Sequence, residues 1–104
     1  MAITGCHSPS IDATLVNATS QPLTLIQVDY PSASFGLQTL QPGQNFHYRF
    51  TVQGSGPIKL DYTDVARRDH KATGPDLREG NDGPLRIVLA ADGVHWEPAA
   101  FPSR

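Results

Sequence analysis

The sequence FHYRFTV at residues 46–52 has the clearest alternation in the chain, and it decides the fold class. Its apolar members fall on one side of an extended strand and its polar members on the other. The apolar members are Phe46, Tyr48, Phe50 and Val52, and the polar members are His47, Arg49 and Thr51. This alternation of period two predicts a β-strand that buries one face.

The segment IKLDYT, residues 58–63, repeats this alternation after a glycine-rich link. We expect it to form a hairpin with the preceding strand, with Val52 opposite Ile58 on the buried side. The same register places Arg49 opposite Asp61 on the outer side, where an opposite-charge pair contributes about 0.2–1 kcal/mol.

Residues 85–96 predict a second hairpin. Alternating apolar residues lead up to Asp92 and Gly93, a pair that favours a two-residue type I′ turn. This turn places Trp96 opposite Leu89, so we expect Trp96 to be a core residue. The predicted core consists of Phe46, Tyr48, Phe50, Ile58, Leu60, Leu85, Ile87, Leu89 and Trp96.

Weaker signals fill the rest of the chain. Further strands are expected at residues 11–16, Leu23–Tyr30 and 34–40. Residues 65–71 are rich in charge and predict a turn that leads into an edge strand. Residues 74–83 have the composition of a loop.

The length of 104 residues fits one compact domain. Nine Gly, nine Pro and only 17% charged residues favour short strands over long surface helices. We therefore expect an all-β domain at residues 11–97, a small antiparallel β-sandwich of seven or eight short strands, followed by a C-terminal tail at 98–104. The pattern resembles the immunoglobulin-like and transthyretin-like sandwiches of bacterial surface proteins, a likeness of architecture that implies no function.

Residues 3–6, ITGC, resemble a bacterial lipobox, in which an aliphatic and two small residues precede an acceptor cysteine. The resemblance implies cleavage before Cys6 and a diacylglycerol on its thiol, with residues 7–10 as a polar tether between the lipid and the domain. Only Met1 and Ala2 precede this motif here, so the charged and apolar regions of a secretory signal are not in this sequence. The resemblance predicts a membrane-anchored lipoprotein of the bacterial periplasm or cell envelope. The alternative is an N-terminus with an unmodified thiol.

Several function classes find no support in the sequence. The net charge of −2 does not favour a nucleic-acid partner. The longest apolar run, residues 87–91, is far shorter than the roughly 18 residues that span a membrane as a helix. Nucleophile elbows, phosphate-binding loops and metalloprotease motifs are missing, so we expect no enzyme.

Metal and carbohydrate binding are alternatives to be tested. His47, His70 and His95 could meet on an outer face, but the sequence lacks the ligand spacing of a blue-copper site. The loop at residues 76–83 holds oxygen donors that calcium accepts, without the spacing of a calcium-binding loop. The aromatic residues could form a platform for a saccharide. We expect no cofactor.

The remaining class is a non-enzymatic interaction module that binds another protein of the cell envelope through an edge strand or loops. The candidate contact residues are Tyr30 and Phe35, which we expect as exposed apolar groups on either side of one loop, and Arg67, Arg68 and His70 in the charged segment. The oligomeric state is left open.

Overall fold

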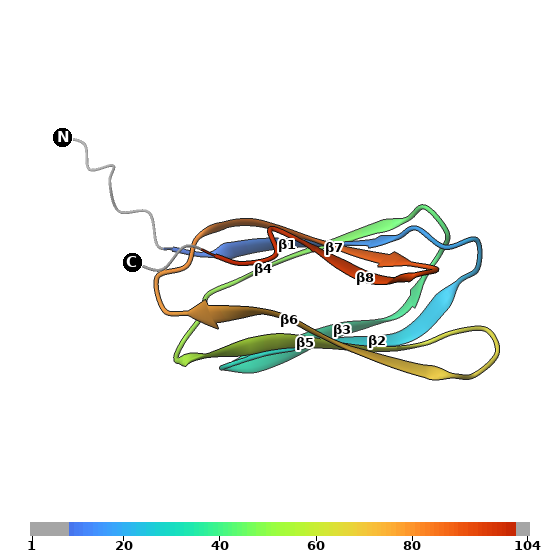
Figure 1. Ribbon diagram of the computed structural model, residues 1–104, viewed down its shortest axis with the longest axis horizontal. Helices are drawn as coiled ribbons and strands as arrows, with labels where there is room; N and C mark the ends of the chain where they lie inside the picture. Colours follow the sequence, from blue (N-terminus) through green and yellow to red (C-terminus); the bar gives the residue numbers. More distant parts are fainter. Residues whose placement is uncertain (1–8, 102–104) are drawn as a thin grey trace.

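The computed structural model describes residues 9–101, which form an all-β sandwich of two four-stranded sheets (Figure 1). The eight strands in this part of the chain are β1 (Ile11–Asn17), β2 (Leu23–Tyr30), β3 (Ala33–Leu40), β4 (Asn45–Phe50), β5 (Ser55–Thr63), β6 (Asp69–Arg78), β7 (Gly83–Ala90) and β8 (Gly93–Glu97). The predicted fold class is confirmed. No helix long and apolar enough to cross a membrane occurs among these residues.

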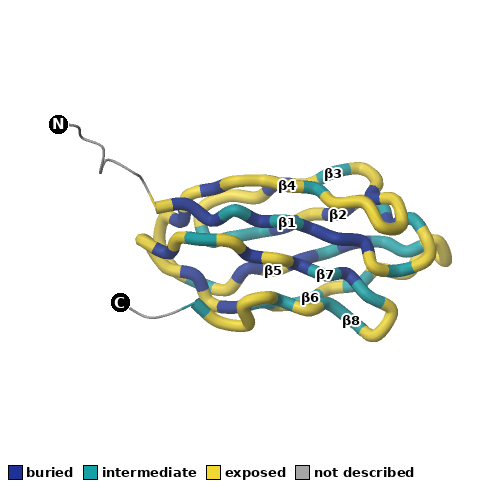
Figure 2. The backbone as a smooth tube through the Cα atoms, turned by 90° about the horizontal axis from the view of Figure 1, so that it is seen from above, coloured by how far each residue is buried: buried dark blue, intermediate teal, exposed yellow. Residues whose placement is uncertain are grey.

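One sheet has the strand order β4-β1-β7-β8 and the other β3-β2-β5-β6. All pairs are antiparallel except β1 with β7, which run parallel. Figure 2 shows β3 and β4 along one side of the sandwich and β6 and β8 along the other. The molecule therefore has two open sides, each bordered by one edge strand from each sheet.

The core lies between the sheets and is built from the inward positions of the strands. Ile58, Leu60, Leu85, Ile87 and Leu89 are fully buried, as the alternation predicts. Fully burying a side chain of this kind contributes about 1.5–3 kcal/mol relative to leaving it exposed.

Three other predicted core residues lie at the margin of the core. Phe46 and Trp96 are half-buried and pack against the core, whereas Tyr48 is 37% exposed. Because β4 and β8 are edge strands, an inward side chain there has a neighbouring strand on one flank only.

The expected hairpin of residues 46–63 does not form. β4 pairs with β1 and places Arg49 opposite Asp12, with Arg49 Nε 3.3 Å from Asp12 Oδ1. β5 lies in the other sheet, between β2 and β6. The link between β4 and β5 crosses from one sheet to the other and buries Val52. Alternation thus predicted the buried faces of both strands but not their partners.

Two other predictions need correction at β6 and β8. Residues 74–78 belong to β6, in which Pro75 and Leu77 are buried, and do not form a loop. In the last hairpin Trp96 pairs with Ile87 and not with Leu89. The register shift is two residues, so the inward face is unchanged.

Candidate functional site

The predicted contact residues fall into two groups at opposite ends of β2. Tyr30 ends β2 and Phe35 lies on β3, next to the turn that joins the two strands. Arg67, Arg68 and His70 lie at the β5–β6 turn, whose strand residue Thr63 pairs with Thr24 near the start of β2. Cys6 lies outside the described residues. The structure therefore does not join the two groups into one site.

A β-bulge distorts β2 near the β5–β6 turn. Thr24 pairs with Thr63 and Gln27 with Asp61, so β2 holds one more residue than β5 between these pairs. Leu25, within the bulge, has a φ of 51° and its side chain is 61% exposed. The bulge reverses the alternation of β2, which lets both Leu23 and Ile26 face the core.

The β5–β6 turn, residues 64–68, is organised by Asp64. Its Oδ1 accepts hydrogen bonds from the backbone N–H groups of Ala66 (2.8 Å) and Arg68 (3.1 Å). Its Oδ2 lies 2.7 Å from His70 Nε2. The backbone N–H of Arg67 donates to the Asp64 carbonyl, and Arg67 has a φ of 64°. Asp64 thereby holds the turn in a conformation that a non-glycine residue rarely adopts.

The pKa of Asp64 is lowered by the same hydrogen bonds that hold the β5–β6 turn. The hydrogen bond with His70 is the largest cause that lowers the pKa of the Asp64 carboxyl, followed by the bond from the Arg68 N–H. The imidazole of His70 also stacks on Tyr62, with ring centroids 4.8 Å apart and planes 9° apart. The pKa of Tyr62 is raised by burial and by the charge of Asp64. His70 therefore positions the turn and is not a free surface group.

The bulge and the turn enclose a hollow of about 430 Å³, which we call the bulge hollow. It is lined by Pro22, Thr24, Leu25, Val65, Arg67 and Asp69, among others. Val65 is 58% exposed, so this hollow contains two of the three exposed large apolar side chains in residues 9–101. Both non-glycine residues with positive φ in that range, Leu25 and Arg67, line it as well.

The bulge hollow has an uneven charge pattern. Asp69 accepts a hydrogen bond from the Thr63 hydroxyl (2.9 Å), and Asp64 is bonded within the turn. The side chain of Arg67 has no hydrogen-bond or ion-pair partner among residues 9–101. The hollow can therefore offer two aliphatic contacts and one available guanidinium.

Sequence reasoning placed Arg67, Arg68 and His70 near this site but missed Leu25 and Val65. A signal for Leu25 exists in the segment LTLI at residues 23–26, where the apolar alternation breaks because Leu25 and Ile26 are consecutive. A break of phase inside a strand indicates a bulge. Val65 gives no such signal, since a single apolar residue in a charged segment is common.

Tyr30 and Phe35 lie at the side bordered by β3 and β4, within a cluster of aromatic rings. Their centroids are 6.3 Å apart. Phe35 is only 8% exposed, so the expectation of an exposed side chain is wrong for it, whereas Tyr30 is half-buried. Phe35 is buried because it points inward from β3 and meets the Tyr48 ring of β4 at 4.2 Å.

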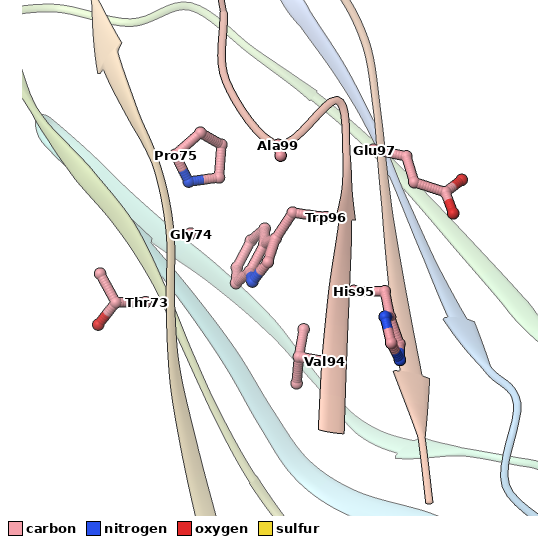
Figure 3. A pocket seen from close by; sticks show the side chains of 8 residues that line it. All are labelled: Thr73, Gly74, Pro75, Val94, His95, Trp96, Glu97 and Ala99. Carbon is pink, nitrogen blue, oxygen red and sulfur yellow. The ribbon is translucent and has the colours of Figure 1, made fainter. Parts of the chain in front are cut away.

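A groove of about 480 Å³ runs between β6 and β8 on the other open side. Figure 3 shows the Trp96 ring between the two strands, directed at Gly74, while the side chains of Thr73, His95 and Glu97 point away from it. His95 Nε2 lies 2.8 Å from Asp92 Oδ1, and Glu97 lies 3.5 Å from Arg86 Nε. The indole of Trp96 is thus the largest apolar side chain of the groove, and His95 and Glu97 are paired with charged neighbours on the outer face.

The three histidines of the described chain do not meet. His47, His70 and His95 each approach a different aspartate, at 4.0, 2.7 and 2.8 Å. Within residues 9–101, no group of three or more His, Cys, Asp and Glu side chains is placed to hold a metal ion.

Comparison with known proteins supports the fold. No family model and no curated protein matches the chain. Among solved structures, the chain is similar to a protein from Eubacterium rectale determined by NMR, with 16% sequence identity and a TM-score of 0.62. The match covers 97% of this chain and 90% of that one. At this identity the likeness shows a shared sandwich fold and nothing about activity.

Proposed function

We propose that this protein is a non-enzymatic interaction module that binds another protein through the bulge hollow, and that it is a lipoprotein of the bacterial envelope held by a lipid on Cys6. The observation that carries the binding proposal is the coincidence of Leu25, Val65 and Arg67 in one hollow. Exposed aliphatic side chains gain contacts only when a partner covers them.

The backbone conformation of Leu25 and Arg67 also supports the bulge hollow as the binding site. A non-glycine residue in the left-handed region costs roughly 1–2 kcal/mol. Such residues cluster at binding and catalytic sites, where the surrounding structure holds them. The bulge holds Leu25, and the hydrogen bonds of Asp64 hold the turn that contains Arg67.

The start of β1 and the bulge hollow lie at opposite ends of the sandwich. β1 begins at Ile11 near the N-terminal end of the molecule, whereas the β5–β6 turn projects from the far end (Figure 1). Ser10 is fixed to the domain, because its N–H donates to Asp82 Oδ1 (2.9 Å) and its hydroxyl accepts from Arg49 Nε (3.0 Å). Ile11 follows Cys6 by five positions, a reach of roughly 17 Å when extended. A domain anchored in this way presents the hollow away from the bilayer.

Site-specific photo-crosslinking in the native cell tests the binding proposal. A photoreactive phenylalanine analogue replaces Val65 in one variant and Leu25 in another, with the exposed Thr51 and Gln53 of the β4–β5 link as control positions. We expect one protein to be captured from both hollow positions and from neither control. The purified partner should then bind Val65→Asp about tenfold more weakly than the wild type and bind Thr51→Asp equally well. Capture of the same proteins from all four positions, or of none from the hollow, contradicts the proposal.

The anchor has an independent test. Mass spectrometry of the protein expressed from its complete gene should show a mature chain that begins at a diacylglyceryl-modified Cys6. An unmodified Cys6 thiol behind an intact N-terminus rejects the anchor and leaves the binding proposal standing.

A further inference from the structure

The side bordered by β3 and β4 gathers most of the aromatic side chains of the protein. The chain contains four Phe, three Tyr and one Trp. Five of these rings form one connected cluster that closes the seam between the sheets: Tyr30, Phe35, Phe46, Tyr48 and Phe50. This aromatic edge lies apart from the bulge hollow, with which it shares no lining residue.

Within the aromatic edge, two tyrosines lie over two buried phenylalanines. The Tyr48 ring stacks on Phe35 with centroids 4.2 Å apart and planes 19° apart. The Tyr30 ring stacks on Phe50 at 4.0 Å and 21°. Phe35 and Phe50 are 8% and 5% exposed, whereas Tyr48 is 37% exposed and Tyr30 half-buried. Each tyrosine thus has a ring fixed from below and a part of its surface open to solvent.

The aromatic edge is neutral. Its rings and hydroxyls carry no charge, and burial, followed by the neighbouring Tyr48, raises the pKa of the Tyr30 hydroxyl further above its ordinary value of 10.0. Arg49 and His47 alternate with these rings along β4 and point to the opposite face, where both approach Asp12. A charged ligand would therefore find no counter-charge among the rings.

We infer that the aromatic edge is a carbohydrate-binding platform that stacks the sugar rings of an oligosaccharide on Tyr48 and Tyr30. A pyranose has an apolar face of C–H groups and a rim of hydroxyls. These match a fixed aromatic face that is bordered by phenolic hydroxyls, each of which can donate and accept a hydrogen bond. Because the rings are already held by Phe35 and Phe50, binding costs little further ordering of side chains.

The experiment is a set of NMR titrations of the full chain with four oligosaccharides, namely cellohexaose, chitohexaose, maltohexaose and xylohexaose, each up to about 10 mM to detect weak affinity. We expect at least one of them to shift the resonances of Tyr48, Tyr30 and Phe35 in a saturable way. Tyr48→Ala should weaken that binding about tenfold or more, and Tyr48→Phe should weaken it less because the stacking face is kept. Val65→Ala, in the bulge hollow, should leave it unchanged.

Three outcomes overturn the inference. The first is the absence of saturable shifts with any of the four sugars. The second is a set of shifts confined to Trp96 and Gly74 on the opposite side of the sandwich. The third is a response of the tyrosines to a decaproline peptide but to no sugar, which would assign the platform to a proline-rich segment. If Tyr48→Ala does not fold, the comparison of Tyr48→Phe with Tyr30→Phe, read by the same resonances, decides whether the hydroxyls take part.

Discussion

The indole ring of Trp96 lies directly on the backbone of Gly74. A Cβ atom added at Gly74 would stand 2.5 Å from Cε3 and 2.6 Å from Cδ2 of the indole. Because Gly74 belongs to the edge strand β6 and Trp96 to the edge strand β8, this contact bridges the two sheets across one open side of the sandwich. The absence of a side chain at residue 74 is thus a packing requirement.

Gly74→Ala is expected to destabilise the protein by roughly 1–3 kcal/mol, since the added methyl group must displace the indole ring or β6. Denaturant unfolding measures the loss. In a Trp96→Leu background the same substitution should cost clearly less, because the atoms that clash are gone. Thr73→Ala, at the exposed neighbouring position, should change stability by less than about 0.5 kcal/mol. An equal loss from Gly74→Ala in both backgrounds would show that the indole contact is not the cause.

Asn17→Ala should be destabilising because Asn17 is fully buried and satisfies several groups. Its Nδ2 donates to the carbonyls of Leu40 and Gln21, each at 2.8 Å, and its Oδ1 accepts from the N–H and hydroxyl of Thr19. Removing the amide leaves the buried Leu40 carbonyl without this donor, at a cost of about 1–3 kcal/mol. Thermal or denaturant unfolding, with the exposed Asn45→Ala as the matched control, measures the difference. Equal stability of the two variants would refute it.

The sequence predicted the faces of the strands well because alternation of period two follows directly from strand geometry. It could not predict strand partners, because every half-buried strand offers the same kind of face. The pairing of β4 with β1 depends on where the link after Phe50 crosses between sheets, and a glycine-rich link permits either route. Residues 74–78 looked like a loop because Gly74 and Pro75 are rare in strands. At an edge strand packed under Trp96, both are accommodated.

The candidate sites were harder to predict than the fold. The bulge hollow depends on an extra residue in β2 and a left-handed turn residue, and only the broken alternation at residues 23–26 hints at the first. The aromatic edge depends on ring contacts between sheets, for example Tyr30 with Phe50, which lie 20 positions apart in sequence. Side chains that meet through tertiary packing leave no local pattern.

Core substitutions should separate the two faces of β5. Leu60 is fully buried and Lys59 is exposed on the adjacent position. We expect Leu60→Ala to lower the free energy of unfolding by about 2–5 kcal/mol and Lys59→Ala by less than about 0.5 kcal/mol. Urea unfolding of the two variants gives both values. Similar losses in the two would contradict the orientation of β5.

The ion pair of His95 and Asp92 should make stability depend on pH. Hydrogen bonding to Asp92 and its charge raise the pKa of His95 above 6.5, and the same hydrogen bond lowers the pKa of Asp92 below 3.8. The stabilisation that accompanies the raised histidine pKa is fully present below pH 6.5. It is lost as the pH rises through the pKa that His95 has in the folded protein. The stabilisation that accompanies the lowered aspartate pKa is fully present above pH 3.8. It is lost as the pH falls through the pKa that Asp92 has in the folded protein.

The stabilisation by this pair is therefore complete between pH 3.8 and 6.5. The melting temperature of His95→Gln should lie below that of the wild type in this window, and the two curves should converge at higher and at lower pH. An NMR titration of the wild type should place the His95 pKa above 6.5. Parallel melting curves across the whole range would show that the ion pair does not contribute.

Leu25→Gly tests whether Leu25 is kept for binding or for stability. Glycine adopts the φ of 51° at Leu25 freely, so the substitution relieves about 1–2 kcal/mol of backbone strain. Glycine also increases the conformational entropy of the unfolded chain, which offsets about 0.5–1 kcal/mol of that gain. Because the Leu25 side chain is 61% exposed, its removal forfeits little buried area.

Leu25→Gly should thus be as stable as the wild type or slightly more stable. It should also be more stable than Leu25→Ala, which keeps the strain and loses the side chain. Denaturant unfolding of the three proteins gives the order. A loss of more than about 2 kcal/mol in Leu25→Gly would mean that this leucine stabilises the fold, and the strained residue would then no longer support a binding role for the hollow.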